Sequence, residues 1–391
     1  MGLISDRLYE KAGHARIPLT GAFELLPVCN LSCKMCYVRK SMAEVQAMGG
    51  LLDGKRWLEL AEEACACGLL FPLLTGGEPF LHPDFRMIYE GMQRLGMQVS
   101  VNSNGTMIDR DTAAWLGSHL PVRINLTRYG ASEDTYERLC GNGAAFGRVR
   151  DAVQWLKHYG VPVKFNTSIT PQNVQDLKAM MDYAKSVGSP IQTATYMFPP
   201  IRRDSSMVGK NDRLSPEEAG LARVKADFYQ SDPAWFLGLA ERFRRFVPLD
   251  ELKLPENPEQ SMNMSCRAGI CSFWINWKGN LSNCGMYGSA ETPLVGRRFA
   301  DAWHELVEMT AAVRYAPACT VCPNRPLCHP CIAMVCNECG DNNGRPEYLC
   351  RMNQAAAQYY GEYAKLLPEV HQSVNPATVS NCELEEFLKK G

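Results

Sequence analysis

The placement of 17 cysteines is the feature that most constrains this chain of 391 residues. Cys29, Cys33 and Cys36 lie close together near the start, and ten more lie between Cys266 and Cys350. The chain is too long for a small disulfide-stapled secreted scaffold, and charged residues interrupt the first 18 positions, where a secretory signal needs an apolar core. In a reducing cytoplasm, clustered thiolates bind metals rather than each other. The sequence therefore predicts a cytoplasmic protein with two metal-binding regions.

Composition narrows the class of protein. The 42 acidic and 41 basic residues leave a formal charge of −1, so no strong field favours nucleic acid or an anionic membrane. The longest apolar run, residues 64–74, contains a glycine and a proline and is too short to span a bilayer. With 46% hydrophobic and 21% charged residues the chain is typical of a globular protein. We therefore expect neither nucleic acid nor a membrane among its partners.

Short apolar segments alternate with longer amphipathic ones over the first half of the chain. This alternation predicts an α/β fold with a parallel sheet and helices packed outside it. Six such units suggest a partial (β/α)6 barrel of the TIM type, whose ligands gather at the carboxyl ends of the strands. The expected strands are 23–28, 69–74, 98–102, 122–126, 161–167 and 191–197, and the expected helices are 54–65, 84–95, 109–116, 146–158 and 173–186.

The alternation stops after Met197, where two prolines and a charged run mark a boundary. Ser215 and Glu218 form a capping box around Pro216, so we expect a helix from there to about residue 230. A linker at 251–259 and a second helix over 353–367 are also expected. The predicted divisions are an amino-terminal segment 1–20, a barrel 21–200, a helical bridge and linker 201–260, a small cysteine-rich domain with a β-hairpin and helices 261–352, and a carboxyl-terminal helix and tail 353–391.

The first three cysteines have the spacing CxxxCxxC and follow directly on the first expected strand. Three thiolates on one loop can bind three irons of a cubane iron–sulfur cluster and leave the fourth iron free for another ligand. A zinc site normally closes its tetrahedron with a fourth nearby ligand, and no Cys or His follows before Cys65. The loop is therefore predicted to bind a [4Fe–4S] cluster through Cys29, Cys33 and Cys36.

With this motif the chain resembles the radical S-adenosylmethionine (SAM) superfamily, in which the same spacing follows the first strand of a partial barrel. The segment Thr75-Gly76-Gly77-Glu78-Pro79 after the second strand is similar to the family's GGEP segment. The resemblance implies that this segment holds the amino group of SAM, with glycines that let the main chain approach and a charge-assisted bond from Glu78. It also implies contacts to SAM from Met35, through its backbone to adenine, and from polar residues at the ends of strands three to five: Ser103, Asn104, Asn125, Asn166 and Ser168.

The second cysteine region resembles the SPASM domain, which carries auxiliary clusters in many radical SAM enzymes. Cys266, Gly279 and Cys284 fit the start of the SPASM pattern, and residues 274–277 are expected to begin a short β-hairpin. The resemblance implies two auxiliary [4Fe–4S] clusters, the first held by Cys266, Cys271, Cys284 and Cys331, the second by Cys319, Cys322, Cys328 and Cys350.

Some cysteines have alternative interpretations. Cys331 comes one residue early for the pattern, which leaves Cys336 as a rival, and Cys339 has no assigned role. Zinc is the competing metal, because two CxxC pairs with a nearby histidine form an acceptable zinc-ribbon arrangement. The amino-terminal motifs favour iron–sulfur clusters over zinc. The isolated thiols are interpreted as small buried residues or, for the last of them, a tail thiol without function: Cys65, Cys67, Cys140 and Cys382.

The resemblance implies reductive cleavage of SAM to a 5′-deoxyadenosyl radical, which abstracts a hydrogen atom from the substrate. Relatives with a SPASM domain mostly modify ribosomally made peptides, so we expect oxidative modification of a peptide, such as a thioether or carbon–carbon cross-link. The reductant would be a flavodoxin or ferredoxin. With only 28 residues before Cys29, we expect a leader peptide to need another docking surface or a separate binding protein.

Two other functions stay open. One is radical oxidation or decarboxylation of a small molecule, a haem precursor or a sugar; the other is a non-enzymatic iron–sulfur or zinc protein, which would leave Gly76-Gly77-Glu78-Pro79 unexplained. Gly285 follows Cys284 where sulfatase-maturing relatives have an aspartate base, which disfavours that activity. The sequence identifies no general base.

Overall fold

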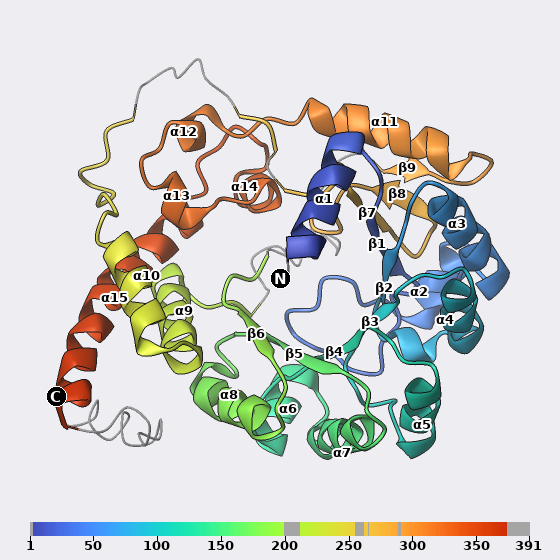
Figure 1. Ribbon diagram of the computed structural model, residues 1–391, viewed down its shortest axis with the longest axis horizontal. Coiled ribbons are helices and arrows are strands. Elements are labelled where there is room, and N and C mark those ends of the chain that lie inside the picture. Colours follow the sequence, from blue (N-terminus) through green and yellow to red (C-terminus); the bar gives the residue numbers. More distant parts are fainter. Residues whose placement is uncertain (1–2, 199–211, 255–261, 265, 288–290, 374–391) are drawn as a thin grey trace.

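The computed structural model describes residues 3–198, 212–254, 262–264, 266–287 and 291–373. In this part of the chain nine strands form one sheet in the order β6-β5-β4-β3-β2-β1-β7-β8-β9. The sheet curves through the middle of the molecule, with helices along its outside (Figure 1). Cys382, the stretch 255–259 and the expected boundary near residue 200 lie outside the described residues.

The six expected barrel strands run parallel, each paired with the next one along the chain, which confirms the predicted α/β fold and partial barrel. The first strand ends earlier than predicted, because residues 25–28 belong to the loop that leads to Cys29. Apolar residues in that loop resemble a strand in sequence, and Leu25 N still donates to the Thr75 carbonyl at 2.9 Å. The bounds are β1 Thr20–Glu24, β2 Phe71–Thr75, β3 Ser100–Ser103, β4 Arg123–Thr127, β5 Val163–Ser168 and β6 Ile191–Ala194.

One face of the barrel sheet is apolar and the other is polar. Phe23, Leu74 and Phe165 belong to the main core cluster, together with side chains of the outer helices. Successive residues of a strand point to opposite faces, so Thr75 and Asn102, which hydrogen-bond to each other, occupy the inner face. A TIM barrel normally fills its interior with branched apolar side chains. The polar interior of this barrel is instead suited to a polar ligand.

The outer helices follow the predicted pattern, with three additions. Asp53, Asp109 and Ser132 cap their helices by accepting a hydrogen bond from the backbone three residues later. The helices α1 Leu3–Ala15, α2 Met42–Ala47 and α6 Glu133–Cys140 were not predicted, and the expected helix 173–186 begins as a 3-10 turn, η2 Val174–Asp176. The remaining bounds are α3 Gly54–Ala66, η1 Pro79–Leu81, α4 Phe85–Arg94, α5 Arg110–Ser118, α7 Ala145–His158 and α8 Leu177–Ser186.

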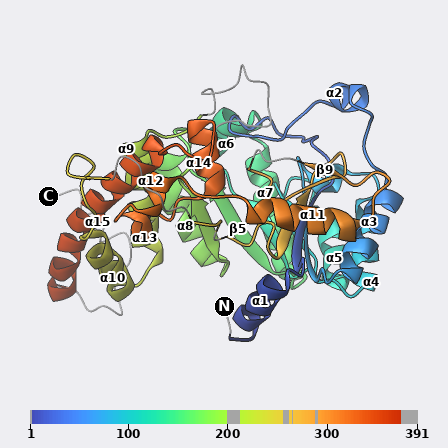
Figure 2. The ribbon, with the colours of Figure 1, turned by 90° about the horizontal axis from the view of Figure 1, so that it is seen from above.

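Three helices form a separate layer beside β6. The expected capping box at Ser215 and Glu218 is present and begins α9 Pro216–Gln230. The carboxyl-terminal helix α15 spans Glu347–Ser373, so it starts before the predicted residue 353, and it packs with α9 and with α10 Pro233–Phe243. Figure 2 shows these three helices together at the end of the molecule away from α3, α4 and α5.

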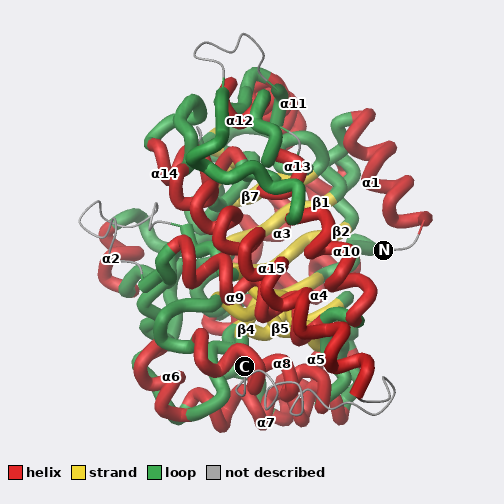
Figure 3. Tube along the Cα trace, turned by 90° about the vertical axis from the view of Figure 1, so that its left-hand side faces the viewer, coloured by secondary structure: helices red, strands yellow, loops and turns green. Residues whose placement is uncertain are grey.

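The cysteine-rich region continues the barrel sheet. The expected hairpin is formed by β7 Ser272–Ile275 and β8 Asn280–Ser282, and β7 also pairs in parallel with β1. β9 Thr292–Pro293 follows, and then α11 Phe299–Ala311, α12 Pro317–Thr320, α13 Arg325–Cys328 and α14 Ile332–Cys339. Figure 3 places α11 and α12 at the opposite end of the molecule from α7 and α8. In the described part of the chain, no helix is both long and apolar enough to cross a membrane.

Candidate functional site

A cavity at the carboxyl ends of the barrel strands brings the CxxxCxxC loop together with the ends of β2 to β5. Seven of the ten predicted SAM contacts line it, from four separate parts of the chain: Met35, Gly76, Gly77, Ser103, Asn104, Asn166 and Ser168. The thiols of Cys29, Cys33 and Cys36 line it as well. The lining also includes eight residues that are not among the ten predicted contacts: Leu31, Tyr37, Val38, Thr75, Asn102, Thr127, Tyr129 and Met197.

The cysteine loop is held against β3 and α6. Asn104 donates through Nδ2 to Cys29 Sγ at 3.5 Å and to Asn30 Oδ1 at 2.9 Å. On the other side, Ser32 N donates to the Cys140 carbonyl at 2.9 Å. Asn104, a predicted contact of SAM, is therefore hydrogen-bonded directly to Cys29, a predicted ligand of the cluster.

Cys33 has two polar neighbours that the sequence did not reveal. The Cys140 thiol and the Tyr129 hydroxyl donate hydrogen bonds to Cys33 and lower its pKa. Burial has the opposite effect on Cys29 and raises its pKa to about 12. Cys140 is 107 residues from Cys33, so spacing carries no signal of the contact; Tyr129, two residues beyond β4, lies at a strand end where ligand contacts are expected. The interpretation of Cys140 as a plain core residue missed this contact.

The two glycines of the GGEP segment let two loops pack together. A Cβ atom on Gly76 would lie 2.3 Å from the Leu26 carbonyl oxygen, and one on Gly77 would lie 2.2 Å from the Val28 carbonyl oxygen. Gly77 N donates to the same Leu26 oxygen at 2.7 Å. These contacts require glycine, because any side chain would push apart the segment leading to Cys29 and the cavity wall.

Glu78 has a different set of partners from the ammonium contact that the resemblance implied. Its carboxylate is fully buried and accepts from Ser103 Oγ at 2.9 Å, from Asn104 N at 2.7 Å and from Phe80 N at 3.3 Å. Burial outweighs these hydrogen bonds and raises its pKa to about 7. The side chain lies outside the cavity lining and shapes the loop that carries Asn104.

Pro79 and Asn125 also lie outside the lining. Pro79 is the buried first residue of η1, and Asn125 lies two residues before the end of β4, where it donates to Asn102 Oδ1 at 2.9 Å. The contacts with SAM expected for these two residues stay a prediction. Asn166 does line the cavity, and its buried Oδ1 accepts no hydrogen bond from any described residue. This oxygen is ready to accept a hydrogen bond from a bound ligand.

The donor set of the cavity fits a cluster with one open iron. Its described lining offers three thiols but no fourth Cys and no His, Asp or Glu. Among the described residues, no three Cys, His, Asp or Glu side chains converge closely enough to hold a single metal ion.

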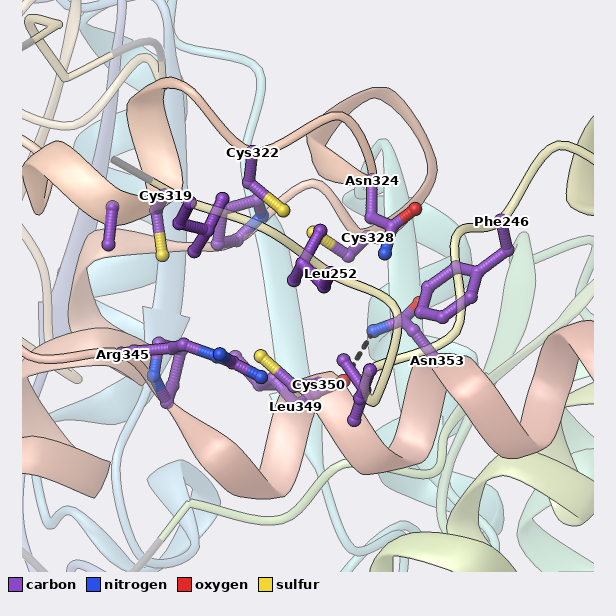
Figure 4. A pocket seen from close by; sticks show the side chains of 15 residues that line it. Phe246, Leu252, Cys319, Cys322, Asn324, Cys328, Arg345, Leu349, Cys350 and Asn353 are labelled. Atoms are coloured by element: carbon purple, nitrogen blue, oxygen red, sulfur yellow. Dashed lines mark hydrogen bonds between the residues drawn. The ribbon is translucent and has the colours of Figure 1, made fainter. Parts of the chain in front are cut away.

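A second cavity is lined by four cysteines (Figure 4). They come from α12, the turn after it, the end of α13 and the first turn of α15, and they are the four that the resemblance assigned to the second auxiliary cluster: Cys319, Cys322, Cys328 and Cys350. Burial, together with the proximity of Cys322 and Cys350, raises the pKa of Cys328 to about 12. The lining has no Asp, Glu or His, and its one charged side chain, Arg345, does not ligate iron. The four thiols therefore fit a cluster that is fully ligated by cysteines.

The cysteines assigned to the first auxiliary cluster are only partly gathered. Cys266 lies within electrostatic range of Cys331 and Cys284. Cys271 instead packs into an apolar cluster with Ala12 and Leu19. A ligand role for Cys271 would require its side chain to turn out of this cluster, so that role stays a prediction.

The rival ligand Cys336 lies elsewhere. It shares α14 with Cys339, and the charges nearest to this pair are those of Asp341 and Glu338. Of the two alternatives for the first auxiliary site, the structure thus brings Cys331, and not Cys336, to Cys266.

Comparison with known proteins agrees with the geometry. Residues 23–184 match the family model of the radical SAM superfamily. The chain is 22% identical over 334 residues to an AdoMet-dependent haem synthase of Methanosarcina barkeri, covering 82% of this chain and 93% of that protein. It is 20% identical over 291 residues to the antilisterial bacteriocin subtilosin biosynthesis protein AlbA of Bacillus subtilis, covering 74% and 59%.

Among solved structures, anSMEcpe with bound AdoMet and Cp18Cys peptide has the same fold. It aligns with a TM-score of 0.63 at 17% identity, over 90% of this chain and 98% of that one. Together with the CxxxCxxC cavity at the strand ends, these matches show that residues 23–184 form a radical SAM domain and that the chain shares the fold of anSMEcpe.

Proposed function

We propose that this radical SAM enzyme oxidatively modifies a ribosomally made peptide, forming a thioether or carbon–carbon cross-link, with two auxiliary clusters in its carboxyl-terminal region. The observation that carries the proposal is the presence of two different cysteine cavities in one chain. Three thiols share a polar cavity with the GGEP glycines, and four thiols line a separate one. A cluster whose irons are all ligated by cysteines can accept the electron that a substrate loses when it is oxidised.

Cys29, Cys33 and Cys36 would hold a [4Fe–4S] cluster, which would supply the electron needed for the reductive cleavage of SAM. The protein positions the reactants: Asn104 fixes Cys29, Gly76 and Gly77 keep the backbone close, and Asn166 offers an unused acceptor. Apolar side chains in the same lining exclude water from the reacting atoms, which protects a radical from side reactions: Leu31, Met35, Val38 and Met197.

A peptide substrate is supported by two of the similar proteins. AlbA belongs to the biosynthesis of subtilosin, and anSMEcpe was solved with a bound peptide. The barrel opening supports the same class, since β6 is an edge strand of the sheet and leaves one side of the barrel unclosed.

A second candidate is the oxidation or decarboxylation of a haem precursor. It is favoured by the similarity to the haem synthase, which extends over 93% of that protein. Both candidates use the same radical chemistry, so they differ in the substrate and not in the cluster sites.

The test begins with anaerobic reconstitution. We expect about 12 iron atoms per chain, three clusters of four, and formation of 5′-deoxyadenosine with a strong reductant. Cys33→Ala should abolish deoxyadenosine, whereas Cys140→Ala, its matched neighbour outside the ligand set, should retain it. Formation of deoxyadenosine by Cys33→Ala would contradict the assignment of the catalytic cluster.

The same preparation identifies the substrate class. It is incubated in parallel with a small peptide encoded beside its gene and with an iron-bound porphyrin that carries propionates, and both are weighed by mass spectrometry. Loss of two hydrogen atoms from the peptide supports the proposal. Loss of carbon dioxide from the porphyrin, with an unchanged peptide, supports the second candidate and overturns the first.

A further inference from the structure

Apart from its cysteines, the four-cysteine cavity is lined mostly by apolar side chains. On one side it is covered by apolar side chains from the segment that follows α10: Phe246, Leu249, Leu252 and Leu254. Among the residues that line it, Arg345 alone carries a charged side chain. Figure 4 shows this side chain along the α15 side of the cavity, extended toward Cys350. Arg345 is exposed to solvent, so its charge acts mainly at short range, on the thiols that its guanidinium approaches.

Arg345 is placed by the backbone next to it. Pro346 follows it directly and accepts a hydrogen bond from Cys350 N at 3.1 Å, which closes the first turn of α15. The guanidinium donates a hydrogen bond to the Cys350 sulfur and lies in electrostatic range of Cys322 and Cys319. One cation thus reaches three of the four thiols.

The helix adds charge of the same sign. Cys350 lies in the first turn of α15, a helix of 27 residues, and the positive end of a helix dipole is at its amino terminus. The described lining includes no acidic side chain; the one acidic residue in the first turn of α15, Glu347, is exposed and lies outside the lining.

We propose that Arg345 raises the reduction potential of the cluster held by Cys319, Cys322, Cys328 and Cys350, and so makes it an electron acceptor. A cubane with four thiolate ligands is an anion, and it gains one more negative charge on reduction, so a nearby cation stabilises the reduced form. The step favoured is the transfer of one electron from the substrate radical, which is oxidised, to this cluster, which is reduced. The inference rests on the proposed function, because it requires a cluster in this cavity.

The test is a redox titration of the reconstituted enzyme followed by electron paramagnetic resonance. Arg345→Gln removes the charge and keeps a hydrogen-bond donor, and Arg345→Lys keeps the charge. Arg351→Gln is the matched control, because Arg351 lies on the same helix but pairs with Glu217 on α9 at 2.9 Å. Arg345→Gln should shift the reduction equilibrium of one cluster about tenfold toward the oxidised form, about 59 mV for one electron. Arg345→Lys and Arg351→Gln should stay near the natural enzyme.

Each outcome separates the inference from the function on which it rests. If the natural enzyme binds no cluster at these four cysteines, the proposed function is contradicted, whatever the variants show. Twelve irons in both Arg345→Gln and the natural enzyme, with equal potentials, overturn the inference alone.

If Arg345→Gln does not keep its iron, Arg345→His decides the question. Its imidazole gains a positive charge as the pH falls through about 6.5. The potential of one cluster should then rise with falling pH, more steeply than in the natural enzyme, and a slope no steeper than that of the natural enzyme overturns the inference.

Discussion

The cysteines of the barrel and those of the carboxyl-terminal region differ in what surrounds their sulfur atoms. The three barrel thiols share their cavity with amide and hydroxyl side chains and with the glycine backbone. The four thiols near α15 are covered by leucine and phenylalanine side chains. An incomplete ligand set in a polar cavity suits a cluster that binds a substrate or cofactor, whereas a complete set behind apolar walls suits one that only carries electrons. The walls therefore distinguish the two roles as clearly as the number of ligands does.

The largest effect is expected when a cysteine is removed from the four-cysteine cavity. Cys350→Ala should lower the iron content by about four atoms of 12, because three thiolates cannot hold a fully ligated cluster in an apolar cavity. Formation of deoxyadenosine should persist, since the barrel cluster is untouched. Iron analysis and the deoxyadenosine assay check both statements.

Cys336→Ala is the control for this change. Cys336 is a half-exposed thiol on α14 that does not line either cavity, so its removal should leave all 12 irons. Equal iron loss in both variants would mean that the four-cysteine cavity is not the cluster site, and it would revive the zinc-ribbon pairing of the two CxxC motifs.

The next test concerns the cysteines assigned to the first auxiliary cluster. Cys331→Ala should lose about four irons, because Cys331 lies with Cys266 and Cys284. Cys271→Ala should keep all 12 and lower the free energy of unfolding by about 1 kcal/mol, as expected for a small cavity in an apolar cluster. Iron analysis and thermal unfolding measure the two effects. Loss of iron from Cys271→Ala would show that Cys271 turns toward the cluster when iron is present.

The sequence predicted those parts of the site that are defined by motifs at fixed positions along the chain. The CxxxCxxC loop, the glycines and the polar strand ends recur at fixed places in the barrel, so the fold could be predicted, as could the position of seven of the ten expected contact residues in the cavity lining. Contacts across the chain were not. Glu78 is turned away from the cavity by Ser103 and Asn104, 25 and 26 residues later, and Cys140 reaches Cys33 only because α6 packs on the cysteine loop. Such contacts depend on packing that leaves no trace in local spacing.

The last test lies on the barrel side of the comparison, at Glu78. Burial raises its pKa from 4.5 to about 7, so the folded protein binds a proton more tightly there than the unfolded chain does. The stabilising contribution of this proton is complete below about pH 4.5 and is lost as the pH rises toward about 7, over a total of up to about 3 kcal/mol. In Glu78→Gln this loss should be absent, and the unfolding midpoint should vary less between about pH 5 and pH 8.

Glu44→Gln is the control for Glu78. Hydrogen bonds from Ser41 lower the pKa of this exposed carboxylate, so its stabilising contribution is lost only as the pH falls below the usual range of a glutamate, and the slope between pH 5 and pH 8 should not change. An unchanged slope in Glu78→Gln would mean that Glu78 stays ionised throughout. A buried, permanently charged carboxylate beside the Asn104 backbone would then be an additional negative charge near Cys29, and the barrel site would differ from the four-cysteine site in charge as well as in walls and ligands.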